Sequence, residues 1–264
     1  MNLTDPGELK ALLARHGLVN QKKWGQHFLV SRPVVDAIVG SVAAFQGVLE
    51  VGPGPGVLTH DLCTSHPVIA YEVDPVAVSV LTESAPSAVI RHEDALAVDL
   101  GAALGELPEP RAIVSNMPYN ITGPLLTLFA RHRGLIGQAT LMMQKEVGER
   151  ILAQPGNSDR GSLSVFLQFQ FEIRKLCNAP KGAFFPPPKV DSVVLVLTPR
   201  PDSPDDKLLD RIRVCFAQPR KTLLNNLLAI FPREEAVARL GRAGLAESVR
   251  PHQLTQEQWL VVLG

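Results

Sequence analysis

The sequence predicts an α/β fold, in which a doubly wound, largely parallel sheet precedes a small all-helical C-terminal domain. Three observations support this prediction. Short β-branched runs alternate with helical patterns from about Val48 to Val147, which is typical of a parallel sheet with helices on both faces. A segment rich in Pro, Asp and Ser at residues 199–204 indicates a linker. Beyond this linker, the apolar residues recur at helical spacing to the end of the chain.

The individual elements follow from the local pattern. The expected strands are Val48–Val51, Val68–Val73, Ala88–Arg91, Ala112–Ser115 and Ala139–Met143. The helices expected between them are Val57–Ser65, Pro75–Glu83 and Gly123–His132. Upstream, Ser31 followed by Pro33 and a run of apolar residues predicts a capped amphipathic helix.

The later part of the chain predicts two further sheet or core elements and then four helices. The two elements are Leu163–Phe171 and Ser192–Leu197. The helices are Leu208–Phe216, Thr222–Ile230, Arg233–Gly241 and Thr255–Leu263. We therefore expect a sheet domain over residues 1–199, including an N-terminal extension at 1–30, and a helical domain over residues 200–264.

Composition limits the class of protein. The 264 residues are 45% hydrophobic, enough to bury a real core, and 26 basic residues balance 26 acidic ones. Zero net charge disfavours binding of nucleic acid through a strongly basic tail, although it does not exclude local basic patches. The acidic residues are in excess between 50 and 199, and both ends of the chain are mildly basic.

The three cysteines and seven histidines show no zinc spacing, so no metal site is expected. The sequence has neither a signal-peptide pattern nor a long apolar run, which favours a cytoplasmic protein without membrane contact.

A glycine loop at Gly52-Pro53-Gly54-Pro55-Gly56 follows the first strand and opens a helix. Glycines at such a turn let the backbone approach a ligand closely. The third glycine of the dinucleotide fingerprint is missing, because position 57 is Val, and two prolines remove amide donors that a pyrophosphate would need. The loop therefore favours a cofactor without phosphates, and S-adenosylmethionine (SAM) fits.

Two carboxylates are placed to bind the same ligand. Glu72 ends the next strand, 20 residues after Gly52, where the acid of a nucleotide-binding unit accepts both ribose hydroxyls. Asp94 follows the third strand and is expected to meet the adenine edge. Three successive strand ends thus carry the groups that a SAM site requires.

The fourth strand runs into Ser115-Asn116-Met117-Pro118-Tyr119-Asn120. The side-chain carbonyl of Asn116 and the backbone carbonyl of Met117 offer two acceptors for one exocyclic amine. Pro118 rigidifies the turn, and Tyr119 presents a ring on which a base can stack. Two acceptors at an adenine N6 favour a tetrahedral nitrogen whose lone pair can attack a sulfonium methyl, so that much of the catalysis is positioning.

The sequence resembles a known family, the KsgA-like adenine N6,N6-dimethyltransferases of small-subunit ribosomal RNA. The segments that carry the resemblance are Trp24–Leu29, Gly52–Gly56, Asn116–Thr122, Gln144–Val147, Phe184–Ser192 and Arg220–Leu227. The resemblance implies a Rossmann-like SAM-dependent methyltransferase sheet with a helical C-terminal domain. It also implies dimethylation of two adjacent adenosines near the 3′ end of 16S rRNA, on a pre-small ribosomal subunit, as a step of rRNA processing and ribosome biogenesis. Nothing in the sequence requires more than a monomer.

The resemblance also assigns roles to single residues. His27 and Leu29 would lie at the methionine end of SAM, and Gln26 would also contact the cofactor. Gly52 and Gly54 would contact SAM through their own backbone. Asn116 would lie between methyl donor and acceptor. Phe184 would close the second face of the target adenine against Tyr119, as expected for an extruded base. One departure stands out, since the family usually has Asn where this chain has His27, and a titratable ring replaces a neutral amide.

Binding of RNA also requires contacts to phosphates. The principal candidates are Lys22, Lys23, Lys189, Arg220 and Lys221, and further basic residues are Arg160, Lys181, Arg211 and Arg213. The family commonly has two arginines before the Lys-Thr pair, whereas this chain has Pro219-Arg220, so one basic contact is missing.

Two rival functions stay open at the level of sequence. An erythromycin-resistance type methyltransferase of 23S rRNA shares the glycine loop and a similar Asn-x-Pro-Tyr turn, although Arg220-Lys221-Thr222 and Asn120-Ile121-Thr122 favour the small subunit. A non-catalytic assembly or transcription factor could keep the fold in order to bind RNA. The intact Asn116, Tyr119, Glu72 and Asp94 argue against it, and His27 leaves it open.

Overall fold

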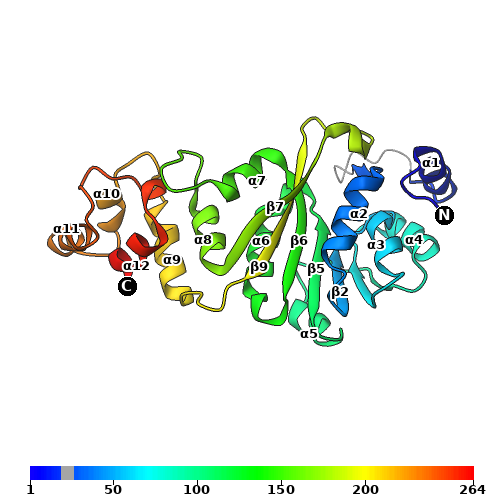
Figure 1. Cartoon of the computed structure of the whole chain (residues 1–264), viewed down its shortest axis with the longest axis horizontal. Coiled ribbons are helices and arrows are strands. Elements are labelled where there is room, and N and C mark those ends of the chain that lie inside the picture. Colours follow the sequence, from blue (N-terminus) through cyan, green and yellow to red (C-terminus); the bar gives the residue numbers. More distant parts are fainter. Residues whose placement is uncertain (19–26) are drawn as a thin grey trace. The chain divides into compact units, whose positions relative to one another are not determined.

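The computed structural model describes residues 1–18 and 27–264, and these form two compact units (Figure 1). The first comprises Met1–Gly148 and Ile173–Pro199, and the second comprises Glu149–Glu172 and Arg200–Gly264. This division differs from the expected one, because residues 149–172 belong to the helical unit. The reason is that α8 (Ser162–Gln170) packs against α9 (Asp206–Cys215).

A seven-stranded sheet forms the centre of the first unit, with the strand order β4-β3-β2-β5-β6-β9-β7. The five strands expected from the sequence are parallel: β2 (Gly47–Val51), β3 (Val68–Tyr71), β4 (Val89–Arg91), β5 (Arg111–Asn116) and β6 (Gln138–Gln144). β9 (Ser192–Pro199) runs antiparallel to β6. The order reverses between β2 and β5, and a parallel sheet binds ligands beyond its strand ends at such a point. The predicted fold class is confirmed.

Four crossover helices connect the parallel strands, and all but the third of them were predicted from the sequence. They are α3 (Val57–Leu62), α4 (Pro75–Ser84), α5 (Leu100–Gly105) and α6 (Thr122–Arg131). Right-handed crossovers place α3 and α4 on one face of the sheet and α5 and α6 on the other. α2 (Arg32–Ser41) packs against α3 and begins after Ser31, with a proline in its first turn, although the Ser31 side chain makes no capping bond.

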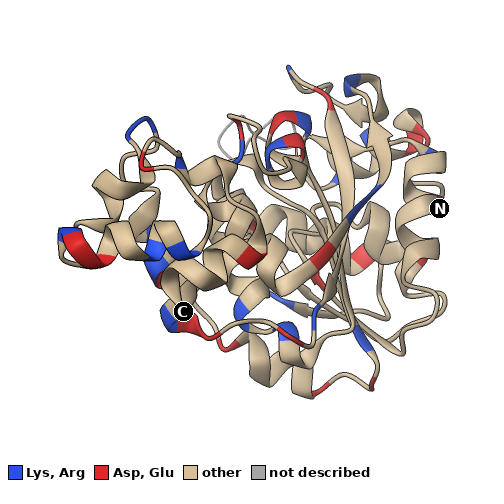
Figure 2. Cartoon of the chain, turned by 60° about the vertical axis from the view of Figure 1, so that its left-hand side comes forward, with Lys and Arg blue, Asp and Glu red and all other residues tan. Residues whose placement is uncertain are grey.

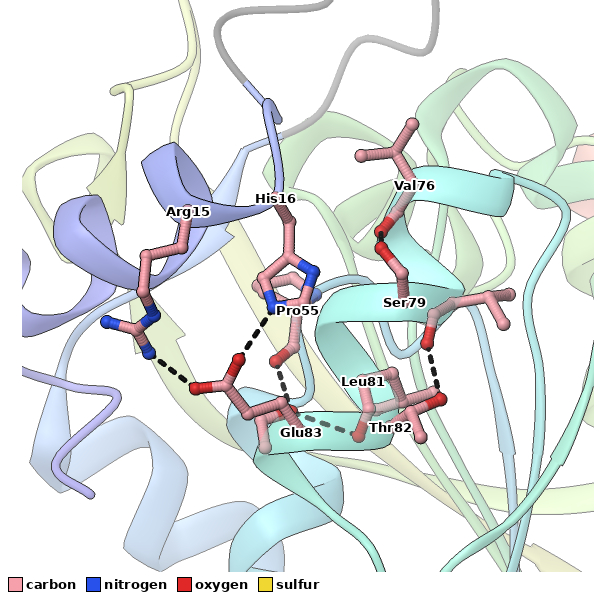
Figure 3. Close-up of polar contacts among 10 residues, drawn as sticks. Arg15, His16, Pro55, Val76, Ser79, Leu81, Thr82 and Glu83 are labelled. Atoms are coloured by element: carbon pink, nitrogen blue, oxygen red, sulfur yellow. Dashed lines mark hydrogen bonds and ion pairs between the residues drawn. The ribbon is translucent and has the colours of Figure 1, made fainter.

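An N-terminal helix that the sequence analysis did not anticipate, α1 (Pro6–Arg15), completes the first unit. Its Leu9, Leu12 and Leu13 enter the hydrophobic core. The side chains of Arg15 and His16 reach Glu83 of α4 at 2.5 and 2.7 Å (Figure 3). The helix is therefore held both by apolar burial and by these side-chain contacts with Glu83.

Three further strands were not anticipated either. β1 (Phe28–Leu29) and β8 (Phe184–Phe185) pair antiparallel as a separate two-stranded sheet. β7 (Phe171–Ala179) forms the outer edge of the main sheet beside β9. Of the two expected later elements, Ser192–Leu197 is the strand β9, whereas Leu163–Phe171 is mostly the helix α8.

The second unit is helical, as predicted. In addition to α8 and α9 it contains α10 (Leu223–Leu227), α11 (Arg233–Arg242) and α12 (Gln256–Leu263). Its centre includes the guanidinium of Arg160, which is 2% exposed. This group donates to the carbonyl of Leu254 at 2.6 Å and to Gln168 Oε1 at 3.0 and 3.2 Å. Arg160 is therefore a structural tie, and the expectation that it contacts RNA is wrong.

Candidate active site

A cavity of about 480 Å³ lies where the carboxyl ends of β2, β3 and β5 meet. It contains most of the residues that the sequence analysis selected. They are His27, Leu29, Gly52, Gly54, Glu72, Asp94, Asn116, Met117, Pro118 and Tyr119. Because the strands are parallel, the segments that follow β2, β3, β4 and β5 converge at one edge of the sheet, and His27 and Leu29 line the same cavity.

The glycine loop forms part of the wall and needs its glycines. Gly52, Gly54 and Gly56 have φ angles of +71°, +56° and +87°, a region that side chains disfavour. A Cβ on Gly54 would lie 3.3 Å from the Phe28 ring. The loop therefore adopts a backbone path that brings it against the cavity without side chains in the way.

Glu72 is oriented by the loop and by its own turn. The amide of Gly54 donates to Oε2 at 3.0 Å, and the amides of Val73 and Asp74 donate to Oε1 at 2.8 and 3.0 Å. A carboxylate offers about four acceptor positions, so one position on Oε2 is left for a ligand. This is one fewer than the two expected for both ribose hydroxyls. Burial raises the pKa of Glu72, although the three amides oppose that shift.

Asp94 is exposed at the cavity rim. Its Oδ1 accepts the amide of Leu96 at 2.9 Å, which forms a tight turn and fixes the carboxylate. Ala95 and Leu96 line the same part of the cavity. This combination of apolar wall and carboxylate rim suits a flat heterocycle with an amino group at its edge.

The turn after β5 provides the two predicted acceptors. Asn116 Nδ2 donates to the carbonyl of His27 at 3.4 Å. This bond sets the orientation of the amide and leaves Oδ1 without a hydrogen bond from the residues described. The amide of Met117 donates to the Met142 carbonyl at 3.0 Å and anchors the turn to β6. Within the described chain, no hydrogen bond to the Met117 carbonyl is formed.

The ring that faces Tyr119 is His27, with ring centres 6.1 Å apart and planes inclined by 29°. His27 Nδ1 donates to the carbonyl of Pro186 at 2.8 Å, so its ring is also fixed. Phe184, in contrast, does not line the cavity. It is 3% exposed and lies in the hydrophobic core, where its backbone pairs with Leu29. The expectation that Phe184 faces Tyr119 across the base pocket is therefore corrected, because β8 turns its side chain into the core.

One cavity residue that sequence reasoning missed is Glu50, which is 1% exposed. Its Oε2 has no hydrogen-bond partner among the described residues. Burial raises the pKa of this carboxyl to about 8, and the charge of Glu72 contributes to the shift. A signal was present in the sequence, since an acid interrupts the buried strand Val48-Leu49-Glu50-Val51. Phe28 was also missed as part of the cavity wall.

The basic candidates for RNA contact lie in both units. Lys189 is exposed in the first unit, and Arg220 and Lys221 are exposed in the second, before α10. Among the described residues, none of the three forms an ion pair. Arg211 instead donates to the Leu263 carbonyl at 2.7 Å. Lys and Arg are interspersed with Asp and Glu along the ribbon (Figure 2).

Three predicted residues, Gln26, Lys22 and Lys23, lie outside the described residues. Within residues 1–18 and 27–264, no group of His, Cys, Asp or Glu could hold a metal ion. No helix in the same ranges is long and apolar enough to cross a membrane.

Comparisons with known proteins identify the family of the chain. Residues 17–263 match the family described as "Ribosomal RNA adenine dimethylase". Proteins named "Ribosomal RNA small subunit methyltransferase A" are similar to this chain. The one from Levilactobacillus brevis is 36% identical over 95% of this chain and 91% of its own length. The one from Pseudomonas fluorescens is 40% identical over 89% of each.

Two solved structures resemble the fold. A dimethyladenosine transferase from Plasmodium falciparum has a TM-score of 0.74 and 28% identity, covering 90% of this chain and 96% of that one. The 23S rRNA methyltransferase ErmE has a TM-score of 0.66 and 27% identity, covering 89% and 98%.

Proposed function

Because the chain belongs to the ribosomal RNA adenine dimethylase family, we propose that it dimethylates N6 of two adjacent adenosines near the 3′ end of 16S rRNA. The methyl donor is SAM, and the protein acts on a pre-small ribosomal subunit during ribosome biogenesis. The observation that carries the proposal is the Asn116-Met117-Pro118-Tyr119 turn, whose two free acceptors adjoin the cavity. We further propose a cytoplasmic monomer.

The cavity suits SAM. Glu72 has one acceptor position left for a ribose hydroxyl, and Asp94 with Ala95 and Leu96 suits the adenine. Gly54 lets the loop lie close to the Phe28 ring in the cavity wall, where a Cβ would approach that ring to 3.3 Å. His27 and Leu29 would lie at the methionine end. When bound, SAM supplies an electrophilic methyl group on a positively charged sulfur.

The protein's own residues then position the acceptor. Asn116 Oδ1 and the Met117 carbonyl accept the two N6 protons of adenine and direct its lone pair towards the cavity. Tyr119 offers its ring for stacking, which is worth about 1–3 kcal/mol per base. The two carbonyl groups are neutral acceptors rather than bases, so catalysis rests on orientation.

The decisive experiment incubates the protein with SAM and unmethylated small subunits and maps the modified nucleotides by mass spectrometry. Large subunits and free 16S rRNA are treated in parallel. We expect N6,N6-dimethyladenosine at two adjacent positions of 16S rRNA. Methylation of 23S rRNA instead would establish the erythromycin-resistance type of activity. Binding to small subunits without any methylation would establish a non-catalytic factor.

Asn116→Ala tests the role of the turn. This variant should still bind the particle, whereas its methyl-transfer rate should fall by about 100-fold or more, the loss that follows from misplacing reacting groups. A matched control is Asn178→Ala, because Asn178 is exposed on β7, outside the cavity. An unchanged rate for Asn116→Ala would contradict the mechanism.

A further inference from the structure

The hydroxyl of Tyr119 is fixed by a side chain from a distant part of the sequence. Its Oη lies 2.8 Å from Ser192 Oγ, and 73 residues separate the two. Ser192 is 0% exposed. It is the first residue of β9 and pairs with Gln144 at the end of β6. The contact therefore joins the turn after β5 to β9, which lies two strands away from β5 in the same sheet.

The direction of β9 explains why Ser192 lies there. β9 is antiparallel to β6, so its first residue lies at the edge where the parallel strands end. The position is also held by backbone bonds, since the amide of Lys145 donates to the Asp191 carbonyl at 2.9 Å. The amide of Met117 is bonded to β6 as well. The turn that carries Tyr119 and the strand that carries Ser192 are thus both hydrogen-bonded to β6.

A fixed hydroxyl has consequences for the ring. Tyr119 begins the single turn η2 (Tyr119–Ile121), and a backbone turn does not by itself fix the plane of a side-chain ring. A phenol prefers its O–H bond in the plane of the ring, and a partner at hydrogen-bonding distance therefore favours one ring plane. Burial raises the pKa of Tyr119, which keeps the phenol neutral and able to donate or accept.

We propose that Ser192 is a positioning residue for methyl transfer, which holds the Tyr119 ring in the plane on which the target adenine stacks. Ser192 touches neither SAM nor the base and acts through Tyr119. The inference rests on the proposed function, because it assumes that Tyr119 receives the base. By this inference β9, which follows the Pro-rich segment at residues 186–188, helps to position the target base.

A double-mutant cycle tests this assignment. Ser192→Ala and Tyr119→Phe each remove the hydrogen bond and keep the other side chain nearly intact. With saturating SAM and unmethylated small subunits, each variant should lower the single-turnover rate by about 2- to 13-fold, which corresponds to a net hydrogen bond of about 0.5–1.5 kcal/mol. The dissociation constant for SAM should not change. The double variant should be no slower than the slower single variant, because both changes remove one interaction.

Two controls separate positioning from stability. Ser41→Ala removes another contact between hydroxyls, at 2.9 Å from Thr140 and outside the cavity, and should leave the rate unchanged. Ser192→Thr keeps a hydroxyl and should recover the rate. A wild-type rate for Ser192→Ala, losses that multiply in the double variant, or an equally slow Ser192→Thr would each overturn the proposal. An inactive wild-type protein would instead refute the proposed function. If Ser192→Ala does not fold, Tyr119→Phe measures the same bond from the other side.

Discussion

Replacing Glu50 with Gln should change how the stability of the protein depends on pH. The carboxyl is buried beside the cavity, and one of its oxygens lacks a hydrogen bond from the described residues. Burial, supported by the charge of Glu72, raises its pKa from 4.5 to about 8. At neutral pH the folded protein therefore keeps a proton on Glu50 that the unfolded chain has lost. Gln is neutral at every pH and nearly the same shape.

The sign of the effect follows from proton binding. Between pH 4.5 and about 8 the folded state binds more protons at Glu50 than the unfolded state. The contribution of Glu50 to stability is thus complete below pH 4.5 and is lost as the pH rises to about 8. The maximal slope is about 1.4 kcal/mol per pH unit, and the total over the window is on the order of 3–5 kcal/mol. Glu50→Gln should lack this loss.

The measurement is urea unfolding of wild type and Glu50→Gln between pH 5 and 8.5. A constant offset between the two reflects amide packing, whereas a difference in unfolding free energy that grows with pH reflects the proton. Glu83→Gln is a comparator of opposite sign, because His16 and Arg15 lower the pKa of Glu83, and its contribution is lost in acid. Parallel pH profiles for wild type and Glu50→Gln would refute the reasoning.

Three further changes have defined outcomes. Gly56→Ala should destabilise the protein by about 2–5 kcal/mol, since the φ of Gly56 is +87° and a Cβ would lie 2.5 Å from a side-chain oxygen of α4. The control Gly17→Ala should destabilise it by only about 1 kcal/mol, because Gly17 has a φ of +68° but open space around it. The melting temperatures of the two variants test this difference. Arg160→Met should destabilise the helical unit by roughly 2–4 kcal/mol in urea unfolding, because it leaves buried acceptors unpaired. Arg220→Glu combined with Lys221→Glu should weaken binding to small subunits in a filter-binding assay and leave the SAM dissociation constant intact; equal loss of both would contradict the separation of RNA and cofactor contacts.

The parallel sheet and the cofactor loop could be predicted because they are encoded locally. A buried strand, a glycine turn and an amphipathic helix each leave a pattern within about ten residues. Glu72, Asp94 and Asn116 lie at or shortly after the ends of expected strands, and a parallel arrangement brings the carboxyl ends of these strands to one edge. Their convergence therefore needed no knowledge of long-range packing.

The remaining features depend on contacts between distant segments. Ser192 meets Tyr119 only because β9 inserts beside β6 in the antiparallel direction, which no local pattern states. Phe184 enters the core because β8 pairs with β1. These two strands are far apart from each other in the sequence, and both are far from the target-base turn. Arginine is usually a surface residue, yet Arg160 is buried and bonds to Gln168 and to carbonyl groups about 90 residues later. Residue type alone could not separate these cases.

Burial also changes what the balanced charge of the chain means. The middle of the sequence holds an excess of acids, but Glu50, Glu72 and Asp74 are all buried. Their carboxyl groups serve the cavity and its turns, so the surface near the site is less acidic than the count of residues suggests. Arg160 is buried as well and gives RNA no phosphate contact. Along the ribbon, acidic residues lie between the basic ones (Figure 2). Recognition of arbitrary RNA should be weak under these conditions, which leaves the shape of the particle and the pocket at Asn116 and Tyr119 to select the target.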